Sequence, residues 1–219
     1  MARRLNLETE RARLEEMRQF ERNYAAFSVI CGIDEAGRGP LAGPVAAAAC
    51  VLPADAEILY LNDSKKLSAA RRESLFTEIR EKAVTFGIAL VSPGEIDRIN
   101  ILQATYEAMR QAVSQLNPQP TLLLNDAVTI PGLPQKQVPI IGGDGKSVSI
   151  AAASILAKVT RDHLMLQYDE AYPEYGFAAN KGYGTAAHIA ALRKYGPCPI
   201  HRQSFIGHFR QEGQCEEND

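Results

Sequence analysis

The most constraining feature of this sequence is an unbroken apolar run, PVAAAACVL, at residues 44–52. A run of this length is typical of a strand that is buried on both faces, so the rest of the chain has to cover both sides of a sheet. Counted from Leu41, the run reaches twelve residues and contains Gly43 and Pro44. It is therefore too short and too interrupted to cross a bilayer. A chain of 219 residues predicts one domain with a large core and a small appendage.

Four further segments have the character of strands. One of them precedes the apolar run and ends in charged residues, and another is a buried segment that ends at Asp126. In chain order the four segments are Val29–Ile33, Val84–Val91, Thr121–Asn125 and Val138–Ile141.

Helical patterns alternate with these strands and then follow them. Residues 5–22 predict a surface helix, because they are rich in Arg, Glu and Leu and lack Gly and Pro. Ser68 can cap a second helix. Apolar residues step by three or four from Ile99 to Leu116, where Pro118 stops the pattern. Two more helices are expected from Ser147 to about Gln167 and over Ala186–Lys194. This order predicts an α/β fold in which helices flank a mixed sheet and form the C-terminal part.

The chain divides into three parts. Residues 1–27 are expected to be a helical extension, residues 28–208 one domain, and residues 209–219 an acidic, disordered tail. The first residues contain no apolar segment of the kind that secretory signals carry.

The cysteines favour a reducing compartment over a disulfide framework. Cys31 and Cys50 lie in apolar runs and are expected to be buried. Cys198 and His201 have C-x-x-H spacing, but no second pair of ligands is nearby, so a structural zinc site is disfavoured. We therefore expect a cytoplasmic, monomeric protein with no membrane partner.

The formal net charge of −2 does not indicate a strongly basic nucleic-acid binder. Its distribution is uneven, because eight Lys or Arg residues stand against five acidic residues between Asp144 and Arg210. On charge alone, this excess predicts only a solvated surface.

Carboxylates follow three of the predicted strands. Asp34 and Glu35 come after Val29–Ile33, while Asp126 and Asp144 come after the last two strands. If they converge on one rim of the sheet, they repel one another unless cations neutralise them. Oxygen ligands without Cys or His indicate Mg²⁺ or Mn²⁺, and two such ions can stabilise both oxygens of a phosphodiester displacement. The alternative is that these residues only cap turns.

Two glycine-rich segments imitate nucleotide-binding loops. The first, from Gly37 to Gly43, is one residue too long for a dinucleotide fingerprint, and Pro40 removes a backbone donor. The second, GKS at residues 145–147, has Ile140 where a P-loop needs glycine. A P-loop-like nucleotide hydrolase is therefore disfavoured.

Several longer motifs stand in a fixed order. They are GIDEAGRGPLAGPV at residues 32–45, NDSKKL at 62–67, Asp126 after its buried strand, GDGKS at 143–147 with SIAAASILAKVTRD at 149–162, YPEYG at 172–176, NKGYGT at 180–185, and YGPCPIHR at 195–202 with Ser204 and Phe205. Together, over residues 28–208, they resemble the type 2 ribonucleases H and, among them, the bacterial ribonuclease HII family.

The resemblance implies a ribonuclease-H-like fold with a helical C-terminal extension. It also implies an endonuclease that hydrolyses the RNA strand of RNA–DNA hybrids and cuts 5′ of ribonucleotides embedded in duplex DNA. Cleavage would use two Mn²⁺ or Mg²⁺ ions and leave a 5′-phosphate and a 3′-hydroxyl. The four acidic metal and catalytic positions of the family match Asp34, Glu35, Asp126 and Asp144.

The resemblance also assigns the contacts to the nucleic acid. The loop Gly37, Arg38 and Gly39 matches the one that senses the ribose 2′-hydroxyl through its backbone, and Tyr183 matches the tyrosine that recognises the junction sugar. A 2′-hydroxyl distinguishes RNA from DNA, and a glycine-flanked loop can approach it closely. The blocks that contact nucleic acid contain Ser64, Lys65, Lys66 and Lys146.

Two positions depart from the family pattern. Gly142 stands where lysine is common, and Gly145 stands where a small residue such as alanine is usual. Both flank Asp144, and neither removes a carboxylate. The related ribonuclease HIII branch carries a substantial N-terminal domain, for which residues 1–27 are too few. The alternative from another class is a catalytically silent module that only binds hybrids, and the complete acidic set argues against it.

Overall fold

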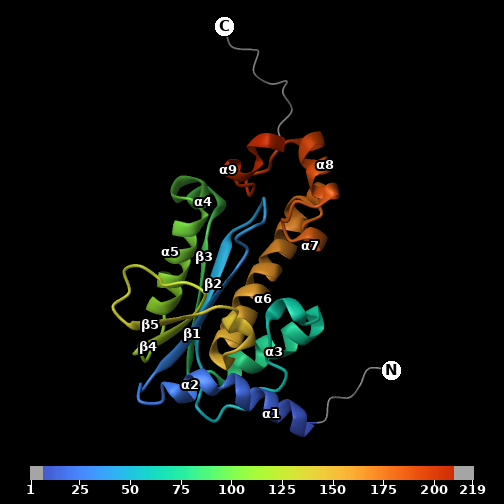
Figure 1. Ribbon diagram of the computed structural model, residues 1–219. Helices are drawn as coiled ribbons and strands as arrows, with labels where there is room; N and C mark the ends of the chain where they lie inside the picture. Colours follow the sequence, from blue (N-terminus) through green and yellow to red (C-terminus); the bar gives the residue numbers. More distant parts are fainter. Residues whose placement is uncertain (1–6, 210–219) are drawn as a thin grey trace.

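The computed structural model describes residues 7–209 and contains a single five-stranded mixed sheet (Figure 1). Its strand order is β3-β2-β1-β4-β5. The central strand β1 pairs antiparallel with β2, which pairs antiparallel with β3. On its other side β1 pairs parallel with β4, which pairs parallel with β5. The strands are β1 (Ile30–Ala36), β2 (Val45–Val51), β3 (Thr85–Val91), β4 (Leu122–Asp126) and β5 (Lys136–Ile140).

Helices cover both faces of this sheet, as Figure 1 shows. One face carries α4 (Pro93–Ile99) and α5 (Ile101–Ser114), and the other carries α3 (Ala69–Lys82) and the long α6 (Val148–Ala171). Beyond the end of the sheet the chain forms the short helices α7 (Phe177–Asn180), α8 (Ala186–Tyr195) and α9 (Gln203–Ile206), with one 3-10 turn before α7 and another after α9. The predicted mixed sheet, flanking helices and helical C-terminal part are thus confirmed.

Strand β2 explains why two helical layers are needed. All seven of its residues are buried, as the apolar run predicted. Successive side chains of a strand point to opposite faces. Accordingly, Ala46, Ala48 and Cys50 pack in the core beneath α3 and α6. The alternate residues Val45, Ala47 and Ala49 pack beneath α5.

Local side-chain caps fix where several helices begin. Ser68 caps α3 by accepting a hydrogen bond from the backbone of Arg71, and Ser147 caps α6 in the same way through Ile150. Both starts match the sequence-based expectation. Helix α6 runs on to Ala171, beyond the expected end near Gln167.

Two predicted elements have different bounds in the structure. Strand β1 continues through Ala36, so Asp34 and Glu35 lie inside the strand and not after it. The helix predicted from Ile99 to Leu116 is divided at Asn100, whose φ of 67° lies in the left-handed region. Asparagine tolerates that conformation, and here its side chain accepts hydrogen bonds from two amides at the start of α5.

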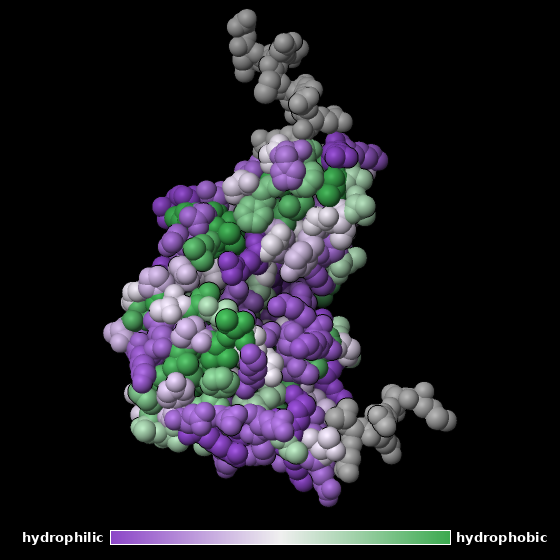
Figure 2. All heavy atoms as spheres, in the orientation of Figure 1, coloured by the Kyte–Doolittle hydropathy of each residue, from purple (hydrophilic) through white to green (hydrophobic). Residues whose placement is uncertain are grey.

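The N-terminal segment forms two helices, α1 (Leu7–Met17) and α2 (Gln19–Asn23), instead of the single helix expected over residues 5–22. Arg18 lies between them and donates hydrogen bonds to the carbonyls of Ala54 and Ala56. Figure 2 shows hydrophilic side chains gathered over these helices at the bottom of the view. Residues 1–6 and, except for Phe209, the expected acidic tail 209–219 lie outside the described residues. Among residues 7–209, no helix combines the length and apolar composition needed to cross a membrane.

Candidate active site

Asp34 and Asp126 reach the same face of the sheet because of strand alternation. In β1, Ile33 packs beneath α5, so the next side chain, Asp34, belongs to the α6 side. In β4, Leu124 packs with Ile150 of α6, and Asp126 is two residues further along the same face. The two strands are parallel, with Ile33 paired to Asn125, so their carboxylates come next to each other.

Asp144 is brought to this pair by the turn that joins β5 to α6. Gly142 has a left-handed φ of 66°, and Gly143 donates its backbone N–H to Oδ1 of Asp126 at 2.7 Å. A Cβ on Gly143 would lie 2.6 Å from Cδ1 of Ile150, so a larger residue here would force the end of that side chain to move. Asp34, Asp126 and Asp144 each place one carboxylate oxygen within 4.8 Å of the others. We call these three residues the acidic cluster.

Burial and mutual repulsion both act on the acidic cluster. Burial, followed by the nearby charge of Glu35, raises the pKa of Asp34 well above its ordinary value. Burial, followed by the charges of Asp63 and Asp126, raises the pKa of Asp144. Bringing such groups together without a cation is unfavourable, which is the electrostatic character of a cation site.

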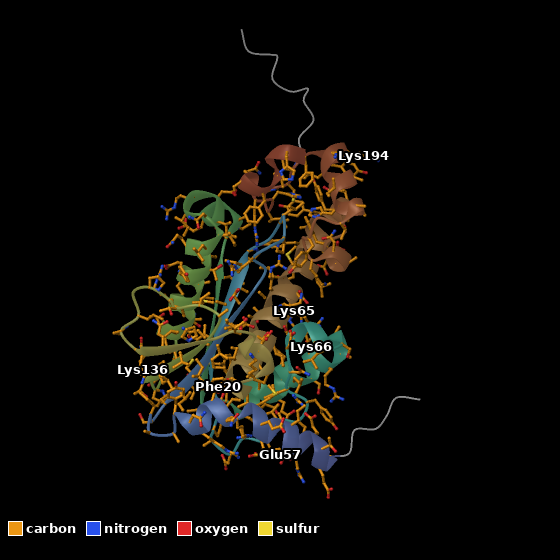
Figure 3. All side chains as sticks on the ribbon, in the orientation of Figure 1. Phe20, Glu57, Lys65, Lys66, Lys136 and Lys194 are labelled. Carbon is orange, nitrogen blue, oxygen red and sulfur yellow. The ribbon has the colours of Figure 1, made fainter. Side chains whose placement is uncertain are left out.

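Lys65 lies within the electrostatic influence of all three carboxylates of the acidic cluster. Partial burial acts to lower the pKa of Lys65, but the nearby carboxylates, led by Asp34 and Asp144, outweigh it, so the pKa is raised. Figure 3 shows Lys65 and Lys66 beside α3 and α6, far from Lys136 and Lys194. Lys66 is mostly exposed and lies 3.7 Å from a carboxylate oxygen of Asp63.

Two other predicted site residues, Lys146 and Glu35, are not part of the acidic cluster. Lys146 is exposed, and its Nζ donates to the carbonyl of Ile141 at 2.7 Å. Glu35 follows Asp34 in the strand and is not one of the three clustered carboxylates. Its Oε1 lies 3.4 Å from Arg38, and burial raises its pKa against the opposing charge of that arginine. Of the four predicted carboxylates, the structure therefore brings three together.

A pocket of about 240 Å³ opens beside the acidic cluster. Strand β1, the turn before α3, helix α6 and the loop before α8 all contribute to it. Its walls include Glu35 and most of the residues that the family resemblance assigns to substrate contact, namely Gly37, Arg38, Gly39, Ser64, Lys65 and Tyr183. Lys66 and Lys146, which the resemblance also assigns to this contact, do not line it.

Two buried arginines, whose role the sequence did not reveal, hold the loop that follows β1. Arg202 donates to the carbonyls of Gly37 at 2.6 Å, Arg38 at 2.8 Å and Gly43 at 2.9 Å. Arg161 donates to the carbonyls of Pro44, Ala42 and Lys181. A trans peptide directs its N–H opposite to its C=O, so the amides of Arg38 and Gly39 face away from Arg202. Arg202 is fully buried, and this burial lowers the pKa of its guanidinium to about 9.

Tyr183 lies beside this loop. A Cβ on Gly39 would be 3.8 Å from its ring, and 46% of the tyrosine is exposed. Its carbonyl accepts a hydrogen bond from Nδ1 of His188 at 2.9 Å, and His188 Nε2 lies 3.0 Å from Nε2 of His201. The backbone N–H of Cys198 donates to Nδ1 of His201. That contact fixes the proton of His201 on Nε2, which donates to His188.

The C-x-x-H pair is therefore part of a hydrogen-bond chain that ends behind Tyr183. Local sequence patterns do not predict this hydrogen-bond chain, because it joins His188 of α8 to His201 in the loop after that helix. In the sequence, this chain is signalled by the C-x-x-H spacing of Cys198 and His201, a spacing that zinc sites share.

We expect the free energy of unfolding to fall in acid because of the hydrogen-bond chain through His188 and His201. Burial, followed by the neighbouring His188, lowers the pKa of His201 to about 4. An unfolded histidine has a pKa of about 6.5, so between these values the unfolded chain binds the extra proton. The contribution of His201 to the free energy of unfolding is therefore fully present above about pH 6.5. It is lost as the pH falls towards 4, and the loss is at most about 3 kcal/mol.

Urea unfolding of the parent and of His201→Gln at pH 7 and pH 4.5 measures this contribution. The difference between the two proteins is the relevant quantity, because the raised pKa values of Asp34 and Asp144 give both proteins a further pH dependence of opposite sign. His163→Gln, on the exposed His163, is the matched control. Equal pH dependence in the parent and His201→Gln would contradict the expectation.

Comparison with known proteins agrees with this geometry. The family model described as Ribonuclease HII matches residues 31–208. A ribonuclease HII of Lachnoclostridium phytofermentans is 62% identical over 200 residues, which cover 91% of this chain and 79% of the relative. One of Clostridioides difficile is 55% identical over 203 residues, which cover 92% of this chain and 80% of the relative.

Solved structures show the same fold. Ribonuclease H2 of Pyrococcus horikoshii has a TM-score of 0.69 at 27% identity and covers 84% of this chain and 99% of its own. The ribonuclease HII of Archaeoglobus fulgidus, solved in complex with PCNA, has a TM-score of 0.69 at 26% identity and covers 84% and 98%. The chain therefore belongs to the ribonuclease HII family.

Proposed function

We propose that this chain hydrolyses the RNA strand of RNA–DNA hybrids and cuts duplex DNA 5′ of an embedded ribonucleotide, leaving a 5′-phosphate and a 3′-hydroxyl. Its family makes it a metal-dependent endoribonuclease that binds hybrids. The observation that supports the finer proposal is the position of the acidic cluster next to a pocket lined by Gly37, Gly39 and Tyr183. We assign the catalytic domain to residues 28–208.

The donor set fits a hard divalent cation. Asp34, Asp126 and Asp144 offer only carboxylate oxygens, which suit Mg²⁺ or Mn²⁺ better than zinc. Glu35 adjoins Asp34 in β1 and lines the neighbouring pocket, so we assign it a contribution to a second ion although it is outside the cluster. When bound, two such ions supply Lewis-acid stabilisation of the charge that develops on the phosphate and on the leaving oxygen. The chain's own carboxylates fix where that stabilisation acts.

Recognition of the substrate falls to the pocket beside the cluster. Carboxylates that hold metal deal only with phosphate and cannot tell ribose from deoxyribose. The outward amides of Arg38 and Gly39 can donate to a 2′-hydroxyl, and the ring of Tyr183 can pack on the adjoining sugar. Lys65 is placed to contact a phosphate, which adds affinity without sequence preference.

We expect metal removal to abolish the activity. The chain is incubated with a DNA duplex that contains one ribonucleotide, with an RNA–DNA hybrid and with an all-DNA duplex, each in Mn²⁺, in Mg²⁺ and in excess EDTA. Cleavage of the first two substrates only, and only with metal, is the expected result. Hydrolysis in EDTA would contradict the proposed metal site, and hybrid binding without cleavage under all conditions would identify a binding module.

A further inference from the structure

The N-terminal helices α1 and α2 precede residues 31–208, which the family model matches. One of their side chains, that of Glu21, nevertheless contacts the start of α6, which follows the turn that carries Asp144. In Figure 1, α2 lies next to the beginning of α6. Oε1 of Glu21 accepts a hydrogen bond from Oγ of Ser147 at 2.6 Å and another from the backbone N–H of Ser149 at 3.0 Å. A carboxylate from one segment thus holds the first turn of α6.

Ser147 connects that first turn to the cluster. Its side chain caps α6 by accepting from Ile150 at 3.2 Å, and its own N–H donates to the carbonyl of Gly143 at 2.9 Å. Gly143 in turn donates to Asp126. The turn that carries Asp144 is therefore held at one end by Asp126 and at the other by Ser147, which is itself held by Glu21.

This support matters because the turn has little stiffness of its own. Glycine occupies positions 142, 143 and 145, and glycine has the largest conformational freedom of any residue. The first amides of a helix have no partner within the helix, and the helix dipole favours a negative group there. Glu21 satisfies one of these amides. The first turn of α6 also packs closely against the backbone of β1, because a Cβ on Gly32 would lie only 2.1 Å from the backbone carbon of Ser149.

We propose that Glu21 is a positioning residue for the metal centre, which fixes the first turn of α6 and, through Ser147, the turn that presents Asp144. The inference rests on the proposed role of Asp144 as a metal ligand. It assigns a function in the reaction to the N-terminal helical segment, although none of its residues reaches the pocket beside the cluster.

The test measures Mn²⁺ binding to the full chain by isothermal titration calorimetry, together with the Mn²⁺ concentration that gives half-maximal hydrolysis. Groups that orient metal ligands typically change metal affinity by about 10–100-fold, and Glu21 acts one contact further away. Glu21→Ala should therefore weaken Mn²⁺ binding by about five- to tenfold. The half-maximal concentration should rise by the same factor, with kcat at saturating Mn²⁺ changed less than about twofold.

Three further variants separate positioning from simple stability. Glu21→Gln keeps an acceptor oxygen for Ser147 and Ser149 and should restore the parent affinity to within about twofold. Glu21→Asp keeps the charge, but its side chain is one methylene shorter and does not reach Ser147 and Ser149. Its Mn²⁺ affinity should therefore be as low as that of Glu21→Ala. Glu16→Ala, on an exposed residue of α1, is the matched control and should leave Mn²⁺ binding unchanged.

Two outcomes would overturn the proposal. One is a lower Tm in Glu21→Ala with parent Mn²⁺ affinity, and the other is identical Mn²⁺ affinity in Glu21→Gln and Glu21→Asp. Asp144→Asn distinguishes this failure from failure of the proposed function. If Asp144→Asn loses Mn²⁺ binding and the Glu21 variants do not, only the role of Glu21 is wrong. If Asp144→Asn binds Mn²⁺ as the parent does, the proposed metal site itself is wrong.

Discussion

Replacing Asp126 with asparagine is expected to lower the rate of hybrid hydrolysis by about 10³-fold or more and to leave the fold intact, because a lost metal ligand removes several kcal/mol of transition-state stabilisation. Asparagine keeps an oxygen at the position where Asp126 accepts the hydrogen bond from Gly143. The turn that carries Asp144 therefore stays anchored, and the substitution removes charge with little change in shape.

The stability of the same variant gives an independent check. Removing one of three close carboxylates relieves repulsion with Asp34 and Asp144, so the Tm without metal should be equal to or above that of the parent. The measurements are kcat with saturating Mn²⁺ and differential scanning calorimetry in EDTA. Asp55→Asn, on an exposed residue that lines a separate pocket with residues of α1, is the control. Near-parent turnover in Asp126→Asn would show that Asp126 only ends a strand.

Tyr183→Ala should reduce cleavage at a single embedded ribonucleotide by about tenfold or more, because a lost contact to a hydroxyl or sugar costs about 1–3 kcal/mol. Long RNA–DNA hybrids should suffer less, since they offer many positions without a junction. The ring stands 46% exposed beside Gly39, so its removal opens the pocket without emptying the core. Cleavage rates of both substrates, measured side by side, give the change in preference.

Tyr183→Phe keeps the ring and should lie between the parent and Tyr183→Ala. Tyr195→Ala serves as the control, because Tyr195 is also an exposed tyrosine of the C-terminal part and does not line the pocket. Raising Mn²⁺ should not restore the junction preference, since the acidic cluster is intact in each variant. If Tyr183→Ala cleaves single ribonucleotides at the parent rate, the tyrosine only packs and recognition depends on the loop at Gly37–Gly39.

Much of this architecture could be predicted because it depends on local patterns. The run at residues 44–52 indicated a strand covered on both faces, and β2 is that strand. Asp126 was correctly expected at the end of a buried segment. The separation of Glu35 from Asp34 was harder to foresee, since it required knowing that β1 continues through both residues and sends them to opposite faces.

Other features depend on contacts that no local pattern contains. A sequence motif does not show whether an arginine is solvated or buried, and nothing in the motifs that contain Arg161 and Arg202 distinguishes these two arginines from surface residues. Both are almost completely buried, and every hydrogen bond described for them goes to a backbone carbonyl. Likewise Glu21 lies 126 residues from Ser147 along the chain, so only the folded structure reveals their contact.

The placement of Arg202 has a consequence for the order in which the protein matures during synthesis. The carbonyls that it holds, on Gly37 and Gly43, were made 165 and 159 residues earlier. All three carboxylates of the acidic cluster, by contrast, and the helix α6 that supports them are complete by Ala171. In the order of synthesis, the residues of the proposed cation site therefore all precede the arginine that holds the loop at Gly37–Gly39. The loop that contains Gly37 and Gly43 can be braced by Arg202 only after the C-terminal part of the chain has been synthesised.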